Sequence, residues 1–121
     1  MGIFDFCKKQ KYKVDKTYIS KDYVERAFHF LIDSGYEYEY YAKYSEREFI
    51  YKLKECRVEI LFEDYVLDCV IQTTDFSRST VTQTPLASDD FKAQFLKASN
   101  QERIDMIAKM LRENSDSFLL S

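Results

Sequence analysis

The chain has 121 residues and a mass of 14.5 kDa, the usual size of one domain built around a single hydrophobic core. Hydrophobic residues make up 45% of it and charged residues 32%, a balance that excludes the composition of disordered chains. A formal net charge of −3 gives no general attraction to phosphate backbones, so nucleic acid is not an expected partner. No apolar run approaches the roughly 20 residues of a membrane span.

Residues 1–19 are expected to form an N-terminal arm ahead of the domain. An apolar tip of Ile3, Phe4 and Phe6 precedes a basic stretch that begins with Lys8 and Lys9. This order is the reverse of a signal peptide, in which the positive charges come first. Because an apolar tip flanked by lysines can lie on an anionic membrane, a membrane surface is an alternative partner.

A helix is predicted from residue 21 to residue 34. Ser20 is placed to cap its first turn, and Gly35 is placed to end it in a left-handed conformation. Apolar residues recur at steps of three and four and form one stripe, which we expect to face the core. The stripe consists of Tyr23, Val24, Ala27, Phe28, Leu31 and Ile32.

Strict alternation over residues 36–71 predicts four antiparallel strands. The alternating set assigned to the core face consists of Tyr36, Tyr38, Tyr40, Phe49, Tyr51, Leu53, Cys56, Val58, Ile60, Phe62, Tyr65, Leu67, Cys69 and Ile71. A two-residue turn at 54–55 pairs Leu53 with Cys56, and one at 63–64 pairs Phe62 with Tyr65. Neither turn carries Asn-Gly or Asp-Gly, so longer or bulged loops are an alternative.

The rest of the chain predicts one more strand or a loop, and then two helices. The Ser- and Thr-rich alternation over 78–84 forms either a fifth, edge strand or part of a long loop. Ser88 is placed to cap one helix and Asn100 to cap the last. The predicted fold class is therefore α+β, with an N-terminal helix packed on a four- or five-stranded antiparallel meander and two C-terminal helices, all in one domain of residues 20–121.

No catalytic or metal-binding motif stands out, so we expect a protein that is not an enzyme and needs no cofactor or metal. His29 projects from the polar side of the first helix, without the buried partner that a general base needs. Cys56 and Cys69 fall on the core face, while Cys7 lies in the arm. The odd number of cysteines, with no C-x-x-C pair, favours a reducing cytoplasm. An enzyme with a dispersed site is an alternative.

The second face of the predicted sheet is mixed in character. It carries Glu37, Glu39, Glu48, Lys52, Arg57, Glu59 and Asp68 together with Tyr41, Ile50, Leu61, Val66 and Val70. Either the C-terminal helices cover this face, or part of it stays open as a binding surface. In the second case carboxylates around aromatic and apolar side chains suit a basic protein partner. The expected contact residues are Glu37, Glu39, Tyr41, Glu48, Glu59 and Leu61.

The segment FHFLIDSGY at residues 28–36, followed by Tyr-rich alternation and by Val58-Glu59-Ile60, resembles small uncharacterised bacterial proteins, some of which look like immunity proteins of toxin systems. Immunity proteins bind a toxin and block it. The resemblance therefore implies a cytoplasmic inhibitor whose partner is a toxin domain. It covers only part of the chain and assigns no functional residue or oligomeric state.

Overall fold

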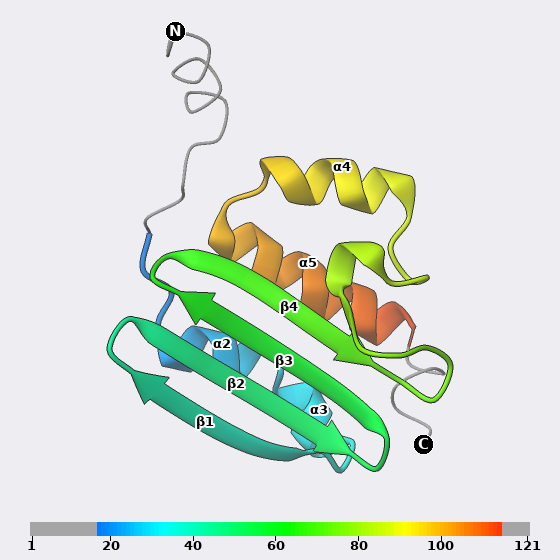
Figure 1. Ribbon diagram of the computed structural model, residues 1–121, viewed down its shortest axis with the longest axis horizontal. Coiled ribbons are helices and arrows are strands. Elements are labelled where there is room, and N and C mark those ends of the chain that lie inside the picture. The colour runs from blue at the N-terminus through cyan, green and yellow to red at the C-terminus, as the bar shows by residue number, and fades with distance from the viewer. Residues whose placement is uncertain (1–16, 115–121) are drawn as a thin grey trace, which may run out of the picture.

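The computed structural model describes residues 17–114, which form a five-stranded antiparallel sheet with helices before and after it in the chain (Figure 1). The strands follow one another in the order β1-β2-β3-β4-β5, so the sheet is a meander and the predicted α+β class is confirmed. The elements in chain order are α2 (Lys21–Ala27), α3 (His29–Asp33), β1 (Glu37–Lys43), β2 (Glu46–Leu53), β3 (Cys56–Glu63), β4 (Val66–Gln72), β5 (Ser79–Thr80), the 3-10 helix η1 (Val81–Gln83), α4 (Asp89–Lys97) and α5 (Asn100–Glu113).

The N-terminal helix is interrupted, where the sequence predicted a continuous one. The Ser20 hydroxyl accepts a hydrogen bond from the Tyr23 N–H at 3.0 Å, which confirms the predicted N-cap. Phe28 leaves the helical range with φ −107° and ψ 12°, and it separates α2 from α3. Beyond this break Ile32 is 37% exposed, so its predicted place in the core stripe is wrong. Gly35 then adopts φ +102°, as expected after a helix end.

Two-residue turns join β1 to β2, β2 to β3 and β3 to β4. The first residue of each turn has a positive φ, namely 57° at Tyr44, 53° at Lys54 and 56° at Asp64. Leu53 pairs with Cys56 across the second turn, as predicted. Tight hairpins therefore form without the Asn-Gly or Asp-Gly pairs that favour them.

The third turn differs from the prediction by one residue. It consists of Asp64 and Tyr65, so Phe62 pairs with Leu67 and the predicted pair of Phe62 with Tyr65 is wrong. The observed partner lies two residues further along β4, and a shift of two keeps every side chain on its face. Among the predicted core residues of this hairpin only Tyr65 changes its environment, because it leaves the core for the turn and is 44% exposed.

The core lies between one face of the sheet and helices α2, α3 and α5 (Figure 1). Its largest fully buried side chains are Tyr51, Phe28, Phe49, Leu31, Ile60, Ile71, Ile104, Ile107, Leu111, Val24 and Val58. Helix α5 shares this core with α2 because its apolar stripe packs on the same sheet face. Ile19, which the prediction assigned to the arm, is also buried in the core.

Serine residues cap both C-terminal helices. Ser88 accepts a hydrogen bond from the Phe91 N–H at 3.0 Å, as predicted for α4. The cap of α5 is Ser99, whose hydroxyl accepts from the Glu102 N–H while the Glu102 side chain accepts from the Ser99 N–H. The predicted cap Asn100 is instead the first helical residue. It is buried, and its side chain donates to the Tyr65 carbonyl at 2.9 Å.

The fifth strand exists but is shorter than the predicted 78–84 segment. Only Ser79 and Thr80 pair with β4, opposite Ile71 and Val70. The chain then turns into η1, which ends the pairing at Val81.

Candidate functional site: the open face of the sheet

The sheet face opposite the core carries no helix in the described part of the chain (Figure 1). Helix α5 packs on the core face, and α4 lies above β4 in the view of Figure 1. Of the two alternatives that the sequence left, the C-terminal helices therefore do not cover the second face. We call this surface the open face.

The strand register arranges the side chains of the open face in four rows that cross the sheet. The rows are Glu37-Lys52-Arg57-Gln72, Glu39-Ile50-Glu59-Val70-Thr80, Tyr41-Glu48-Leu61-Asp68 and Lys43-Glu46-Glu63-Val66. We call the first two rows the paired half and the last two rows the acidic half. The two halves differ in how their carboxylates are neutralised.

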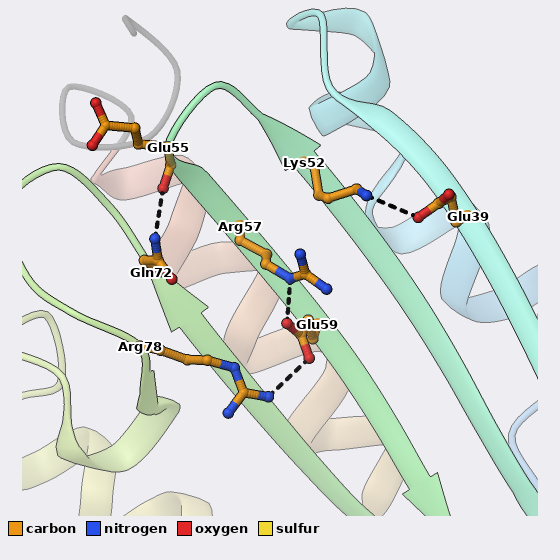
Figure 2. Close-up of polar contacts among 7 residues, drawn as sticks. All are labelled: Glu39, Lys52, Glu55, Arg57, Glu59, Gln72 and Arg78. Atoms are coloured by element: carbon orange, nitrogen blue, oxygen red, sulfur yellow. Dashed lines mark hydrogen bonds and ion pairs between the residues drawn. The ribbon is translucent and has the colours of Figure 1, made fainter.

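Glu59 is the centre of the paired half. Its carboxylate accepts hydrogen bonds from Arg57 Nε and, at 3.0 Å, from Arg78 Nη2, which reaches over the face from the loop after β4 (Figure 2). The residue is only 6% exposed. Burial by itself raises the pKa of Glu59, but the hydrogen bonds from Arg78 and Arg57 outweigh it and hold that pKa below its usual value. This carboxylate is therefore ionised and already neutralised.

Glu39 is neutralised in a similar way. Lys52 Nζ lies 3.0 Å from Glu39 Oε1 across the β1–β2 pair, as Figure 2 shows. The hydrogen bond from this ammonium group lowers the pKa of Glu39. Because the cations in the paired half lie beside its carboxylates, this half of the open face has little charge left to attract a partner.

The acidic half presents carboxylates without such cations. Glu46, Glu48 and Glu63 form no ion pair and no side-chain hydrogen bond with other residues in the range 17–114. Asp68 accepts only from the N–H of its own neighbour, Cys69, at 2.8 Å. The one lysine of these rows, Lys43, has its ammonium 5.6 Å from the centre of the Tyr44 ring. Four carboxylates thus gather at one end of the sheet.

Exposed apolar side chains lie among these carboxylates. Tyr41 is 51% exposed and Val66 is 55% exposed. A shallow hollow of ≈ 280 Å³ between β2, β3 and β4 includes Leu61 and Val66 in its lining, together with all four carboxylate residues. A second hollow of ≈ 570 Å³ runs beside it from Tyr41. The acidic half therefore combines negative charge, accessible apolar area and a concave surface.

Arg47 also borders the smaller hollow but does not neutralise it. Its guanidinium carbon lies 4.6 Å from the centre of the Tyr18 ring and 4.5 Å from that of the Phe62 ring. Phe62 belongs to the core face, so the cation of Arg47 points away from the open face.

The six predicted contact residues all lie on the open face, but they do not form one site. Tyr41, Glu48 and Leu61 are neighbours in the third row. Glu39 and Glu59 are neutralised in the paired half. Glu37 is exposed at the far end of β1, in the first row. The structure thus brings together three of the six predicted residues, Tyr41, Glu48 and Leu61, at the end of the sheet where the first and third turns lie.

The predicted contact set lacked four acidic-half residues that line the smaller hollow. Val66 and Asp68 were assigned to the second face but not to the contact set, and the structure places them beside Leu61. Glu63 was placed in a turn, whereas it is the last residue of β3. Glu46 lies at the start of β2, before the apolar alternation begins. Extending that alternation backward through the strand would have found Glu46, since it lies two residues before Glu48 and therefore on the same face of the sheet.

The residues weighed as reactive groups are placed as follows. His29 is exposed on α3, with its Nδ1 3.3 Å from an Asp33 carboxylate oxygen. Cys56 and Cys69 are buried and unbridged, and burial raises the pKa of the Cys69 thiol. Cys7 and the membrane-contact candidates Ile3, Phe4, Phe6, Lys8 and Lys9 lie outside the described residues. Within 17–114 no three metal-ligating side chains are grouped to hold an ion, and no helix is long and apolar enough to cross a membrane.

Comparison with known proteins gives no relative from which a role can be transferred. No protein-family model matches the chain, and no curated protein or solved structure is significantly similar to it.

Proposed function

We propose that this chain is a non-catalytic protein-binding module that docks a basic surface of another protein on its acidic half. The single observation that supports this most is the uncovered end of the sheet, where four carboxylates that form no ion pair within residues 17–114 surround exposed apolar side chains. The rows involved are those of Tyr41, Glu48, Leu61 and Asp68 and of Lys43, Glu46, Glu63 and Val66.

The physical argument rests on complementarity. Apolar area that water covers in the free protein is released when a partner packs on Leu61 and Val66. Tyrosine is enriched at interfaces because its ring packs while its hydroxyl stays hydrogen-bonded, which suits Tyr41. The surrounding carboxylates steer a cationic partner toward the surface and penalise an anionic one. Association should therefore be fast at low salt and weaken as salt is added.

The narrower form of the proposal is an immunity-type inhibitor that binds a toxin domain in the cytoplasm. Two features support it. The segment at residues 28–36 resembles small uncharacterised bacterial proteins, some of which look like immunity proteins, and an acidic surface without catalytic groups suits a blocker that acts by occupying a basic site. Blocking requires a stable complex of fixed stoichiometry, which is directly measurable.

The test is an affinity capture from the lysate of the native host, with mass spectrometry to identify what is bound. The wild type is compared with Glu48→Lys/Asp68→Lys, which reverses charge in the acidic half. The matched control is Glu55→Lys/Asp75→Lys, which reverses the same number of charges at exposed positions outside the rows of the open face. We expect a basic partner that the control retains and that the double variant loses, with an affinity reduced roughly tenfold or more.

Two outcomes decide between the general and the narrower proposal. A captured partner that is toxic when expressed alone, and harmless when co-expressed with this chain, supports the immunity role. A partner that binds the double variant and the wild type equally well contradicts the assignment of the acidic half. The absence of any specific partner contradicts the binding role itself.

A further inference from the structure

Strand β1 is a long, unpaired edge of the sheet. It lies at the end of the strand order and, among residues 17–114, pairs only with β2, over all seven residues from Glu37 to Lys43 (Figure 1). The pairing contains no bulge and the strand contains no proline, two devices that natural proteins use to block an edge. The opposite edge, β5, is two residues long and offers no comparable ladder.

The hairpin turn determines which backbone groups of β1 face this edge. Lys43 and Glu46 flank the two-residue turn, so they form a hydrogen-bonded pair. Such pairs alternate along an antiparallel ladder, which directs the N–H and C=O groups of residues 37, 39, 41 and 43 toward β2. The groups of Tyr38, Tyr40 and Ala42 point outward instead. These outward groups accept or donate no backbone or side-chain hydrogen bond within residues 17–114.

We infer that this edge pairs with the same edge of a second copy of the chain. Antiparallel pairing about a two-fold axis at Tyr40 places Tyr40 opposite its own copy and Tyr38 opposite Ala42. All three residues carry outward-facing backbone groups, so each opposed pair exchanges hydrogen bonds and the two meanders form one continuous sheet.

The side chains support a second copy as the occupant of this edge. In the register centred on Tyr40, Glu37 of each copy lies opposite Lys43 of the other, which gives two pairs of opposite charge. A register shifted by two residues toward the start of β1 places Glu39 opposite Glu39 of the other copy and is penalised. The register in which all seven residues of the two β1 strands overlap is therefore also one in which opposite charges face each other. Glu37 and Lys43 are both exposed, so they are accessible for this contact.

This assembly is separate from the proposed function. The two-fold axis runs perpendicular to the sheet, so both open faces lie on the same side of the joined sheet and both acidic halves stay accessible. Because the two β1 strands run antiparallel, the acidic half of one copy lies beside the paired half of the other, so each copy presents its own acidic half to a partner. The assembly can be tested without knowing that partner.

The test uses charge variants of the full chain in sedimentation velocity from about 10 μM to about 1 mM. Glu37→Lys alone and Lys43→Glu alone each place like charges at both ends of the interface, and we expect the dimer Kd to rise roughly tenfold. The double variant Glu37→Lys/Lys43→Glu restores opposite charges and should recover the wild-type Kd. An equimolar mixture of the two single variants should dimerise as the wild type does, since opposite charges then meet at both ends.

Amide hydrogen exchange measured at low and high concentration tests the backbone pairing directly. We expect the amides of Tyr38, Tyr40 and Ala42 to become protected as concentration rises, while those of Glu39 and Tyr41 are protected throughout. A wild type that is monomeric over the whole range overturns the proposal. So does a dimer that ignores the single charge reversals or that leaves the three outward amides unprotected.

Discussion

Tyr38 and Tyr51 lie directly opposite each other across β1 and β2, with ring centres 4.8 Å apart and planes inclined by 18°, yet only one hydroxyl is satisfied. Tyr38 donates to a Glu25 carboxylate oxygen at 2.5 Å. The Tyr51 hydroxyl is buried without a hydrogen-bond partner among the described residues. Burial raises the pKa of both phenols well above the usual value, so both are neutral at physiological pH.

This difference predicts opposite effects of the same substitution. Tyr51→Phe removes an unsatisfied buried hydroxyl and should leave the free energy of unfolding unchanged or raise it by up to about 1 kcal/mol. Tyr38→Phe removes a hydrogen bond to a carboxylate and should lower it by about 1 kcal/mol. Urea unfolding of the two variants beside the wild type measures both. A clear loss of stability in Tyr51→Phe would mean that its hydroxyl has a partner.

Glu59 should make stability depend on pH in the acid range. Its pKa is lower in the folded protein than the ordinary 4.5, so its contribution is present above about pH 4.5 and is lost as pH falls through the folded value. At pH 7 Glu59→Gln should be less stable than the wild type by about 1 kcal/mol, because the hydrogen bonds from Arg57 and Arg78 lose their charged acceptor.

The measurement is urea unfolding of the wild type and Glu59→Gln between pH 7 and pH 3. The stability difference should narrow as pH falls below about 4.5. Glu48→Gln, on the same face but exposed, is the control and should show no comparable difference at pH 7. If the free energies of unfolding of the wild type and Glu59→Gln differ by the same amount at every pH, the ionised carboxylate does not have this role.

The hairpin turns hold removable backbone strain. Lys54 is exposed and has φ 53°, a conformation that glycine adopts without penalty. Lys54→Gly should raise the free energy of unfolding by about 0.5 kcal/mol, since relief of strain outweighs the greater entropy of the unfolded chain. Glu55→Gly, at the next turn residue with no positive φ, gains no such relief and should lower it. Equal effects of the two substitutions would contradict this assignment.

The N-cap of α5 is Ser99, and not the predicted Asn100. Ser99→Ala removes the acceptor of the Glu102 N–H and should destabilise the protein by about 1 kcal/mol. Ser99→Asp supplies another acceptor at the helix N-terminus and should retain most of the stability. Thermal unfolding distinguishes the cases, and a Ser99→Asp variant as unstable as Ser99→Ala would show that the hydroxyl does not act as a cap.

Local rules in the sequence were enough to predict most of the fold. Alternation with period two assigns each strand residue to a face, so Tyr51 and Ile60 were expected in the core and are buried there. Ser20 and Ser88 were recognisable as caps, since a hydroxyl beside a helix start satisfies a local N–H group. The misplaced third turn did not alter the faces, because the pairing shifted by an even number of residues.

Only the tertiary structure decided which surface stays open. An apolar stripe such as that of Ile104, Ile107 and Leu111 requires a helix to cover something, but it does not specify which face of a mixed sheet. Tertiary contacts also decided which carboxylates are neutralised. Arg78 reaches Glu59 from a residue 19 positions away, while Glu48 forms no ion pair in the described part of the chain. Alternation therefore fixes the side of the sheet on which a carboxylate lies, and the fold determines whether a partner can use its charge.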